Sequence, residues 1–168
     1  MSLKIGILQG DDIGLEVVPE CIKVMKAAAA RERLEIDWRA LPIGKHGHEQ
    51  HGNTLPAVTE QTLRELDGLG LAPGLCVGER QAMAQATHGS APDIAGRNVA
   101  NPYAMIMSGQ MLLAWLGRKR NEPKARAAAD RIQAAVKTVI VGRKHLTRDL
   151  GGQSSTADMG DAVAAAVQ

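Results

Sequence analysis

Residues 3–38 read LKIGILQGDDIGLEVVPECIKVMKAAAARERLEIDW and set the fold class. The apolar run at residues 3–8 is typical of a short buried strand. Helical spacing of apolar side chains follows the turn at 10–14, and we expect Pro19 in the first turn of this helix. Residues 34–38 alternate apolar and polar side chains, as a half-buried strand does. The order strand, helix, strand predicts two parallel strands joined by a right-handed crossover.

The rest of the chain continues with strands and helices. Residues 42–53, rich in Gly and His, are predicted to form a loop, and a helix is expected at about 56–66. Further elements are expected in this order: a short strand or a turn at 68–74, a strand at 81–87, a Gly- and Pro-rich loop at 88–102, and helices at 102–117, 122–140 and 157–167. Ser155 or Thr156 can cap the last helix. Residues 1–168 are thus predicted to form one α/β domain.

Composition excludes several classes of function. The formal net charge is only +2, and the aromatic residues are two Trp and one Tyr, so neither charge nor base stacking favours a nucleic-acid partner. No run of apolar residues is long enough to span a bilayer, and no membrane partner is expected. The two cysteines form no CxxC pair, and the N-terminal residues lack the pattern of a signal peptide. We expect a cytoplasmic protein.

The first turn, at residues 10–14, reads GDDIG and does not fit the dinucleotide fingerprint GxGxxG. Asp11 and Asp12 are adjacent carboxylates where that fingerprint would hold an anionic phosphate, so a Gly-rich phosphate cradle is disfavoured. The plainer interpretation is that Asp11 or Asp12 caps the following helix.

Three blocks of sequence together resemble the β-decarboxylating dehydrogenases of the isocitrate, isopropylmalate and tartrate/malate group. The blocks are GDDIGLEVVP at 10–19, HGSAPDIAGRNVANP at 88–102, and DLGG at 149–152 with MGDAV at 159–163. They occur in the order of the family. The resemblance implies a three-layer α/β fold with a parallel or mixed sheet flanked by helices, equivalent to a shortened form of the large, cofactor-binding domain of isopropylmalate dehydrogenase.

The resemblance also implies an NAD site built on the loop at 88–102. In the family this loop wraps the adenosine half of the cofactor, and Asp93 matches the carboxylate that binds the adenine-ribose hydroxyls. A carboxylate accepts two hydroxyl hydrogen bonds but repels a 2′-phosphate, which favours NAD over NADP. The cofactor-binding residues implied in this way are Ile13, His88, Gly89, Ser90, Ala91, Pro92, Asp93, Ile94 and Asn101. The alternative is a Gly/Pro turn made rigid for packing.

The chain departs from the family in its middle part. Residues 1–68 match the beginning of the family and residues from about 69 match its final part, with a junction near 68–74. The absent segment carries the substrate-binding arginines, the catalytic Tyr and Lys, and the aspartates that hold Mg²⁺ or Mn²⁺. Tyr103 is the only tyrosine and does not match the catalytic one. We therefore assign no catalytic residue and no metal ligand.

Two other clusters have plain structural interpretations. The stretch HGHEQH at 46–51 offers metal-ligand types at short spacing, but a solvated surface loop is the expectation. Arg118, Lys119 and Arg120 follow a predicted helix, where basic side chains complement the negative end of the helix dipole.

Three functions follow from these observations. The first is an NAD-binding domain that is catalytically incomplete alone. The second is a minimal dehydrogenase with a site rebuilt from residues such as Asp11, Asp12, His46 or His48. The third is a non-enzymatic interaction subunit that pairs with a full-length homologue. Self-association through apolar edges that the missing segment would leave exposed is also expected.

Overall fold

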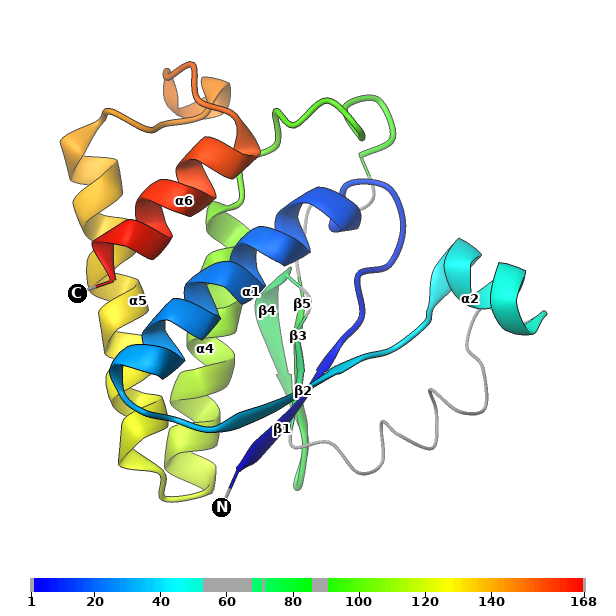
Figure 1. Ribbon diagram of the computed structural model, residues 1–168, viewed down its shortest axis with the longest axis vertical. Coiled ribbons are helices and arrows are strands. Elements are labelled where there is room, and N and C mark those ends of the chain that lie inside the picture. The colour runs from blue at the N-terminus through cyan, green and yellow to red at the C-terminus, as the bar shows by residue number, and fades with distance from the viewer. Residues whose placement is uncertain (1, 53–67, 71, 86–90, 168) are drawn as a thin grey trace.

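The computed structural model describes residues 2–52, 68–70, 72–85 and 91–167. Its strands are β1 (Leu3–Ile7), β2 (Ile36–Ala40), β3 (Gly68–Gly70), β4 (Ala72–Val77) and β5 (Ala82–Gln85). Its helices are α1 (Gly14–Arg31), α2 (Gly44–His51), α4 (Tyr103–Lys119), α5 (Pro123–Gly142), the 3₁₀ turn η1 (Arg148–Leu150) and α6 (Thr156–Ala166). Figure 1 shows these elements along the chain.

The strands form one mixed sheet in the order β2-β1-β3-β5-β4. The pairs β1–β2, β1–β3 and β3–β5 are parallel, whereas β4 and β5 are antiparallel. The parallel pairing of β1 and β2 around α1 confirms the crossover predicted from residues 3–38. The strand alternative at 68–74 is also confirmed, because β3 pairs with β1 and β4 begins at Ala72.

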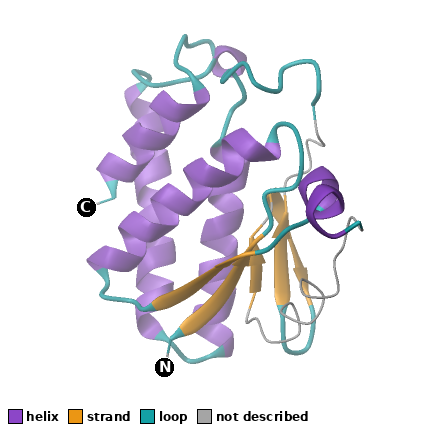
Figure 2. Ribbon diagram, turned by 45° about the vertical axis from the view of Figure 1, so that its right-hand side comes forward, coloured by secondary structure: helices purple, strands orange, loops and turns teal. Residues whose placement is uncertain are grey.

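The four long helices lie together on one side of the sheet (Figure 2). Helix α4 contacts β3, β4 and β5, while α1 packs against α4, α5 and α6. The expected helix at about 56–66 lies outside the described residues. The described elements confirm an α/β fold with a mixed sheet.

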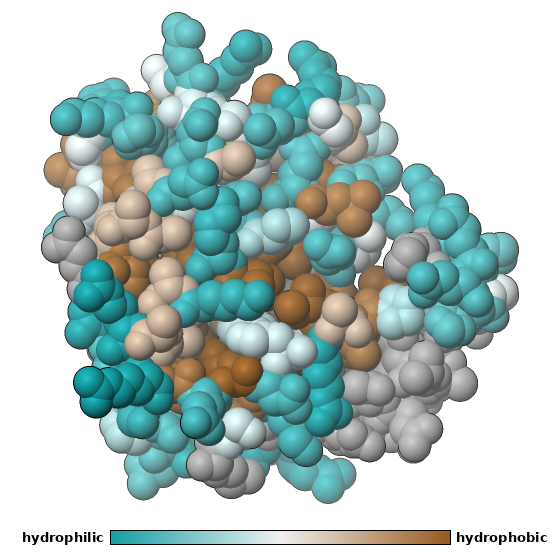
Figure 3. All heavy atoms as spheres, viewed as in Figure 1, coloured by the Kyte–Doolittle hydropathy of each residue, from teal (hydrophilic) through white to brown (hydrophobic). Residues whose placement is uncertain are grey.

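The core is aliphatic, as the scarcity of aromatic residues requires. Side chains of α1, α4 and α5 form one buried cluster with Leu3 and Ile5 of β1. Hydrophilic side chains cover most of the face drawn in Figure 3, and apolar side chains show between them. Burial of apolar area at about 25 cal/mol per Å² is the main force that holds such layers together.

Three local expectations are wrong. Residues 44–51 form helix α2 rather than a loop. Both carboxylate oxygens of Asp11 accept hydrogen bonds from the backbone N–H of Lys45, at 2.9 and 3.2 Å, so Asp11 satisfies a free donor in the first turn of α2 and not of α1. Pro19 lies inside α1, beyond its first turn, because this helix begins at Gly14.

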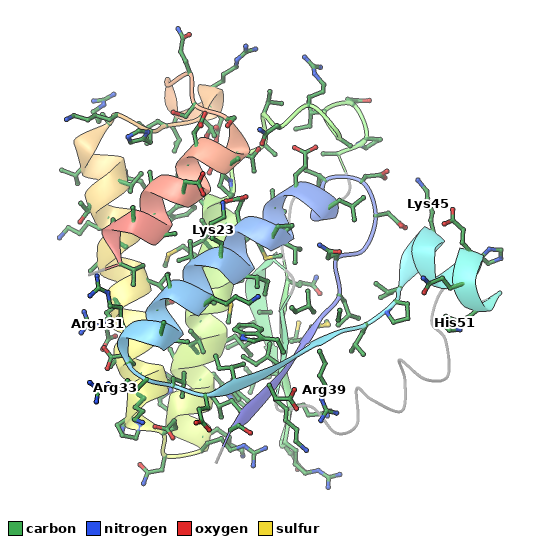
Figure 4. The ribbon with its side chains drawn as sticks, viewed as in Figure 1. Lys23, Arg33, Arg39, Lys45, His51 and Arg131 are labelled. Atoms are coloured by element: carbon green, nitrogen blue, oxygen red, sulfur yellow. The ribbon has the colours of Figure 1, made fainter. Side chains whose placement is uncertain are left out.

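The C-terminal helix begins as expected. The Ser155 side chain accepts a hydrogen bond from the backbone N–H of Asp158, whose carboxylate in turn accepts from Ser155, which completes a capping box. Lys23 connects α1 to α6, because its ammonium group donates hydrogen bonds to Glu20 of α1 and to Asp161 of α6. Figure 4 shows Lys23 between these two helices.

Candidate functional site

A cavity of about 720 Å³ lies where the loop before α4 meets α1 and η1. Four of the residues implied by the sequence line it, namely Ile13, Ala91, Ile94 and Asn101. The other lining residues are Arg97, Val99, Ala100, Tyr103, Ala104, Arg148, Asp149 and Leu150. The walls are therefore largely apolar with a few convergent polar groups, which is the usual make-up of a small-molecule site.

Tight turns and a side-chain contact shape the loop on one side of this cavity. The backbone N–H groups of Ile94 and Ala95 both donate to the carbonyl oxygen of Ala91. Ala91 and Gly96 have positive φ angles of 42° and 76°, and Gly96 adopts this conformation at little cost. The Gly96 N–H donates to the carboxylate of Glu16 in the first turn of α1. The loop is thus fixed to α1.

Asn101 is held by hydrogen bonds at both ends of its side-chain amide. Its Nδ2 donates to Oδ2 of Asp149 at 2.8 Å, and its Oδ1 accepts from the backbone N–H of Tyr103 at 2.8 Å. The hydroxyl of Thr147 donates to the other oxygen of Asp149 at 2.6 Å. These contacts join the start of α4 to η1 across the cavity.

The carboxyl group of Asp149 is ionised in this network. Partial burial raises its pKa, but hydrogen bonds from Thr147, Asn101 and the backbone outweigh this effect and hold the pKa below the ordinary value. Asp149 therefore acts only as an acceptor of hydrogen bonds. The basic side chains of Arg97 and Arg148 also line the cavity and offer donors to an anionic ligand.

The remaining implied residues lie elsewhere. Pro92 and Asp93 are exposed and do not line the cavity, although their neighbours Ala91 and Ile94 do. His88, Gly89 and Ser90 lie outside the described residues. The structure thus brings part of the implied set together and leaves the assignment of Asp93 a prediction.

A second cavity, of about 950 Å³, lies at the carboxyl ends of β1 and β2. Asp11 and Asp12 line it together with Lys45, whose ammonium group lies 3.4 Å from Asp12. Figure 4 shows Lys45 and His51 on α2. His48 and His51 are exposed. Among the described residues, no three His, Cys, Asp or Glu side chains come together in a way that would hold a metal ion.

No binding role followed from the sequence for several residues that line the 720 Å³ cavity, chiefly Arg97, Tyr103, Arg148 and Asp149. The DLGG block at 149–152 was a signal for Asp149, because its place in a family pattern marks it for attention. Nothing in the local sequence shows that this block folds back to Asn101.

In the part of the chain that is described, no helix is long and apolar enough to cross a membrane.

Comparison with known relatives agrees with this architecture. The homoisocitrate dehydrogenase of Methanocaldococcus jannaschii is 43% identical over 98 residues, which cover 58% of this chain and 26% of that protein. The mitochondrial NAD isocitrate dehydrogenase catalytic subunit 6 of Arabidopsis thaliana is 45% identical over 97 residues, covering 57% and 24%. The matched part of the chain spans about a quarter of the length of each of these two relatives.

A solved structure of a Thermus thermophilus protein shares the fold, with a TM-score of 0.50 and 24% identity over 98% of this chain and 34% of that one. The family model described as isocitrate/isopropylmalate dehydrogenase matches residues 4–68 and, in a second segment, residues 65–163. These segments include the described loop residues and the η1 network. The chain therefore belongs to the isocitrate/isopropylmalate dehydrogenase family.

Proposed function

We propose that the chain is an NAD-binding domain of the β-decarboxylating dehydrogenase type that does not turn over substrate alone. The observation that carries this proposal is the 720 Å³ cavity, where Ile13, Ala91, Ile94 and Asn101 meet although they come from two distant parts of the chain. Its volume lies within the range of about 300–1,000 Å³ that is typical of small-molecule pockets.

The lining residues suit the adenosine half of NAD. Ile13 and Ile94 provide apolar surface for the purine ring, and Asn101 provides hydrogen-bonding groups for its edge. Arg97 and Arg148 are placed to attract the pyrophosphate. Asp93, on the exposed part of the same loop, is assigned to the ribose hydroxyls.

The proposal that the chain does not turn over substrate alone rests on the catalytic groups that its residues supply. The bound nicotinamide would accept the hydride, but decarboxylation also needs a base, a divalent cation and an acid. The chain holds a single tyrosine, Tyr103, and it lines the adenosine cavity. The two matched segments of the family model meet at residues 65–68, which supports a junction near 68–74 where the middle domain is absent.

Calorimetric titration with NAD and with NADP tests cofactor binding. We expect heat of binding with NAD and weaker binding of NADP. The Asp93→Ala variant should narrow this difference, because the carboxylate that repels a 2′-phosphate is gone, whereas Asp130→Ala on the exposed face of α5 should not. Absence of NAD binding to the folded wild-type chain would reject the proposal.

An assay of NADH formation with 2-hydroxy diacids, in the presence of Mg²⁺ or Mn²⁺, tests the second part. No turnover is expected. Turnover would instead support a minimal dehydrogenase with a rebuilt site, for which the cavity beside Asp11, Asp12 and Lys45 is the place to look.

Self-association, or pairing with a full-length homologue, is the proposed mode of assembly. Strand β4 forms one edge of the sheet, and among the described strands only β5 pairs with it. It carries no charged residue, and Val77 at its end is 55% exposed. Uncharged strand edges tend to pair with other chains. Light scattering that shows only a monomer would argue against self-association.

A further inference from the structure

We infer that Asp149 is a positioning residue that fixes the amide of Asn101 so that the cavity selects a 6-aminopurine over a 6-oxopurine. This inference rests on the proposed binding of an adenine dinucleotide. It adds a base-selecting function and assigns it to a pair of residues that are 48 positions apart in the chain.

The two ends of the Asn101 amide are distinguished by their partners. The ionised carboxylate of Asp149 can only accept, so the group that faces it, at 2.8 Å, is the NH₂. The backbone N–H of Tyr103 can only donate, so the group that faces it, also at 2.8 Å, is the carbonyl oxygen. Rotating the amide by half a turn would lose both hydrogen bonds and set like groups against each other.

Asp149 acts through Asn101 and does not itself contact the base. Its carboxylate accepts a hydrogen bond from the Thr147 hydroxyl on one oxygen and from the Asn101 amide on the other. Because each oxygen has its own side-chain donor, the carboxylate is held in one orientation, which suits it to hold Asn101 in turn.

The fixed amide leaves one N–H donor and one oxygen lone pair for a ligand. Asn101 lines the cavity, and this donor and this acceptor are the groups of its amide that remain for a ligand there. The N6 amine and N7 of adenine present the complementary pattern, which Asn recognises with two hydrogen bonds. Hypoxanthine has an oxygen in place of the amine. Its oxygen would face the Asn101 oxygen, and one hydrogen bond would be replaced by repulsion.

The test compares the affinities of the full chain for NAD and for its hypoxanthine analogue by calorimetry. Wild type should bind NAD at least about tenfold more tightly, as expected for one two-point contact to a base. Asp149→Ala should lower this preference several-fold, because the Asn101 amide then loses one of the two hydrogen bonds that fix its orientation. Asn101→Ala should remove the preference, and the surface control Asp130→Ala should keep it.

The outcomes separate this inference from the proposed function. If the folded wild-type chain binds neither dinucleotide, both are wrong. If wild type binds the two equally, or if Asp149→Ala weakens both by the same factor, NAD binding stands and the assignment of Asp149 is overturned, since a merely structural role changes no preference. Should Asp149→Ala fail to fold, the preference of wild type for NAD and its loss in Asn101→Ala decide whether Asn101 selects the base. Thr147→Val, which removes one hydrogen-bond donor to Asp149, then decides whether Asp149 positions Asn101.

Discussion

The carboxylate of Glu16 accepts a hydrogen bond from the backbone N–H of Gly96, although 80 positions separate the two residues in the chain. This contact joins the first turn of α1 to the loop that carries Ala91 and Ile94. The other carboxylate oxygen of Glu16 is buried and has no hydrogen-bond partner among the described residues. Glu16 thus connects the strand–helix turn to one wall of the 720 Å³ cavity.

Removing this contact should loosen the loop. A hydrogen bond to a charged group contributes about 1.5–3 kcal/mol, so we expect Glu16→Ala to weaken NAD binding by about tenfold or more. Glu16→Gln keeps an oxygen that can accept from Gly96 and should retain most of the affinity. Calorimetry on both variants measures the effect, and equal affinities in wild type and Glu16→Ala would disprove it.

Gly152 should not tolerate a larger side chain. A Cβ atom at this position would overlap the backbone carbonyl group of Leu146, which cannot give way as the end of a flexible side chain can. We expect Gly152→Ala to lower the free energy of unfolding by about 1–3 kcal/mol, the usual cost of overpacking. Urea denaturation measures this change.

Gly142→Ala is the matched control for that experiment. No heavy atom lies within 4 Å of a Cβ built at Gly142, at the end of α5. The free energy of unfolding should stay the same or rise slightly, because Ala favours a helix more than Gly does. A loss of stability as large as that of Gly152→Ala would contradict the steric explanation.

The two cysteines should differ sharply in reactivity. Burial raises the pKa of the Cys21 thiol to about 12, whereas Cys76 on β4 is exposed. Because the thiolate is the nucleophile, iodoacetamide at pH 8 should modify Cys76 in the native chain and modify Cys21 only after unfolding. Mass spectrometry identifies the site. In Cys76→Ser the native chain should stay unmodified, and rapid modification of Cys21 would show that the α1–α4 interface opens.

The sequence predicted the elements whose signals are local. Strands β1 and β2 and helices α4, α5 and α6 follow from periodicity and from caps that lie within a few residues of each helix end. Helix α2 was missed because the carboxylate that satisfies its first turn belongs to Asp11, 34 positions before Lys45. A cap supplied from another part of the chain leaves no local pattern.

The residues of the candidate site also divide into those that a sequence pattern identifies and those whose role depends on a distant contact. Ile13, Ala91, Ile94 and Asn101 were found because they match a family pattern. The role of Asp149 depends on a contact to Asn101 across 48 positions, and its low pKa arises only when the fold assembles its donors. Spatial convergence of this kind cannot be predicted from one sequence.

Acid should weaken the start of α6. Hydrogen bonds from the backbone N–H and the hydroxyl of Ser155 hold the pKa of Asp158 below its ordinary value of 3.8. A carboxyl group with a lowered pKa in the folded state stabilises the fold fully above the unfolded-state value, and this contribution is lost as the pH falls through the folded-state pKa. Asp158→Ala should therefore be less stable than wild type at pH 7.

The difference in stability between wild type and Asp158→Ala should shrink as the pH falls below about 3.8, because protonation of Asp158 then removes its stabilising contribution from wild type. Thermal denaturation at several pH values measures it. Ser155→Ala removes one of the donors to Asp158. The difference in stability between this variant and wild type should also shrink in acid, but by a smaller amount than for Asp158→Ala. A difference between wild type and Asp158→Ala that stays constant from pH 7 to acid would contradict the assigned cause.

NAD titrated into the ¹⁵N-labelled chain, followed by NMR, tests the location of the cofactor site most directly. The account predicts that the amide signals of Ile13, Ala91, Ile94 and Asn101 shift together, with one dissociation constant, while those of Leu41, Ile43 and Lys45 in the second cavity stay in place. Shifts confined to the second cavity, or no shifts at all, would contradict it.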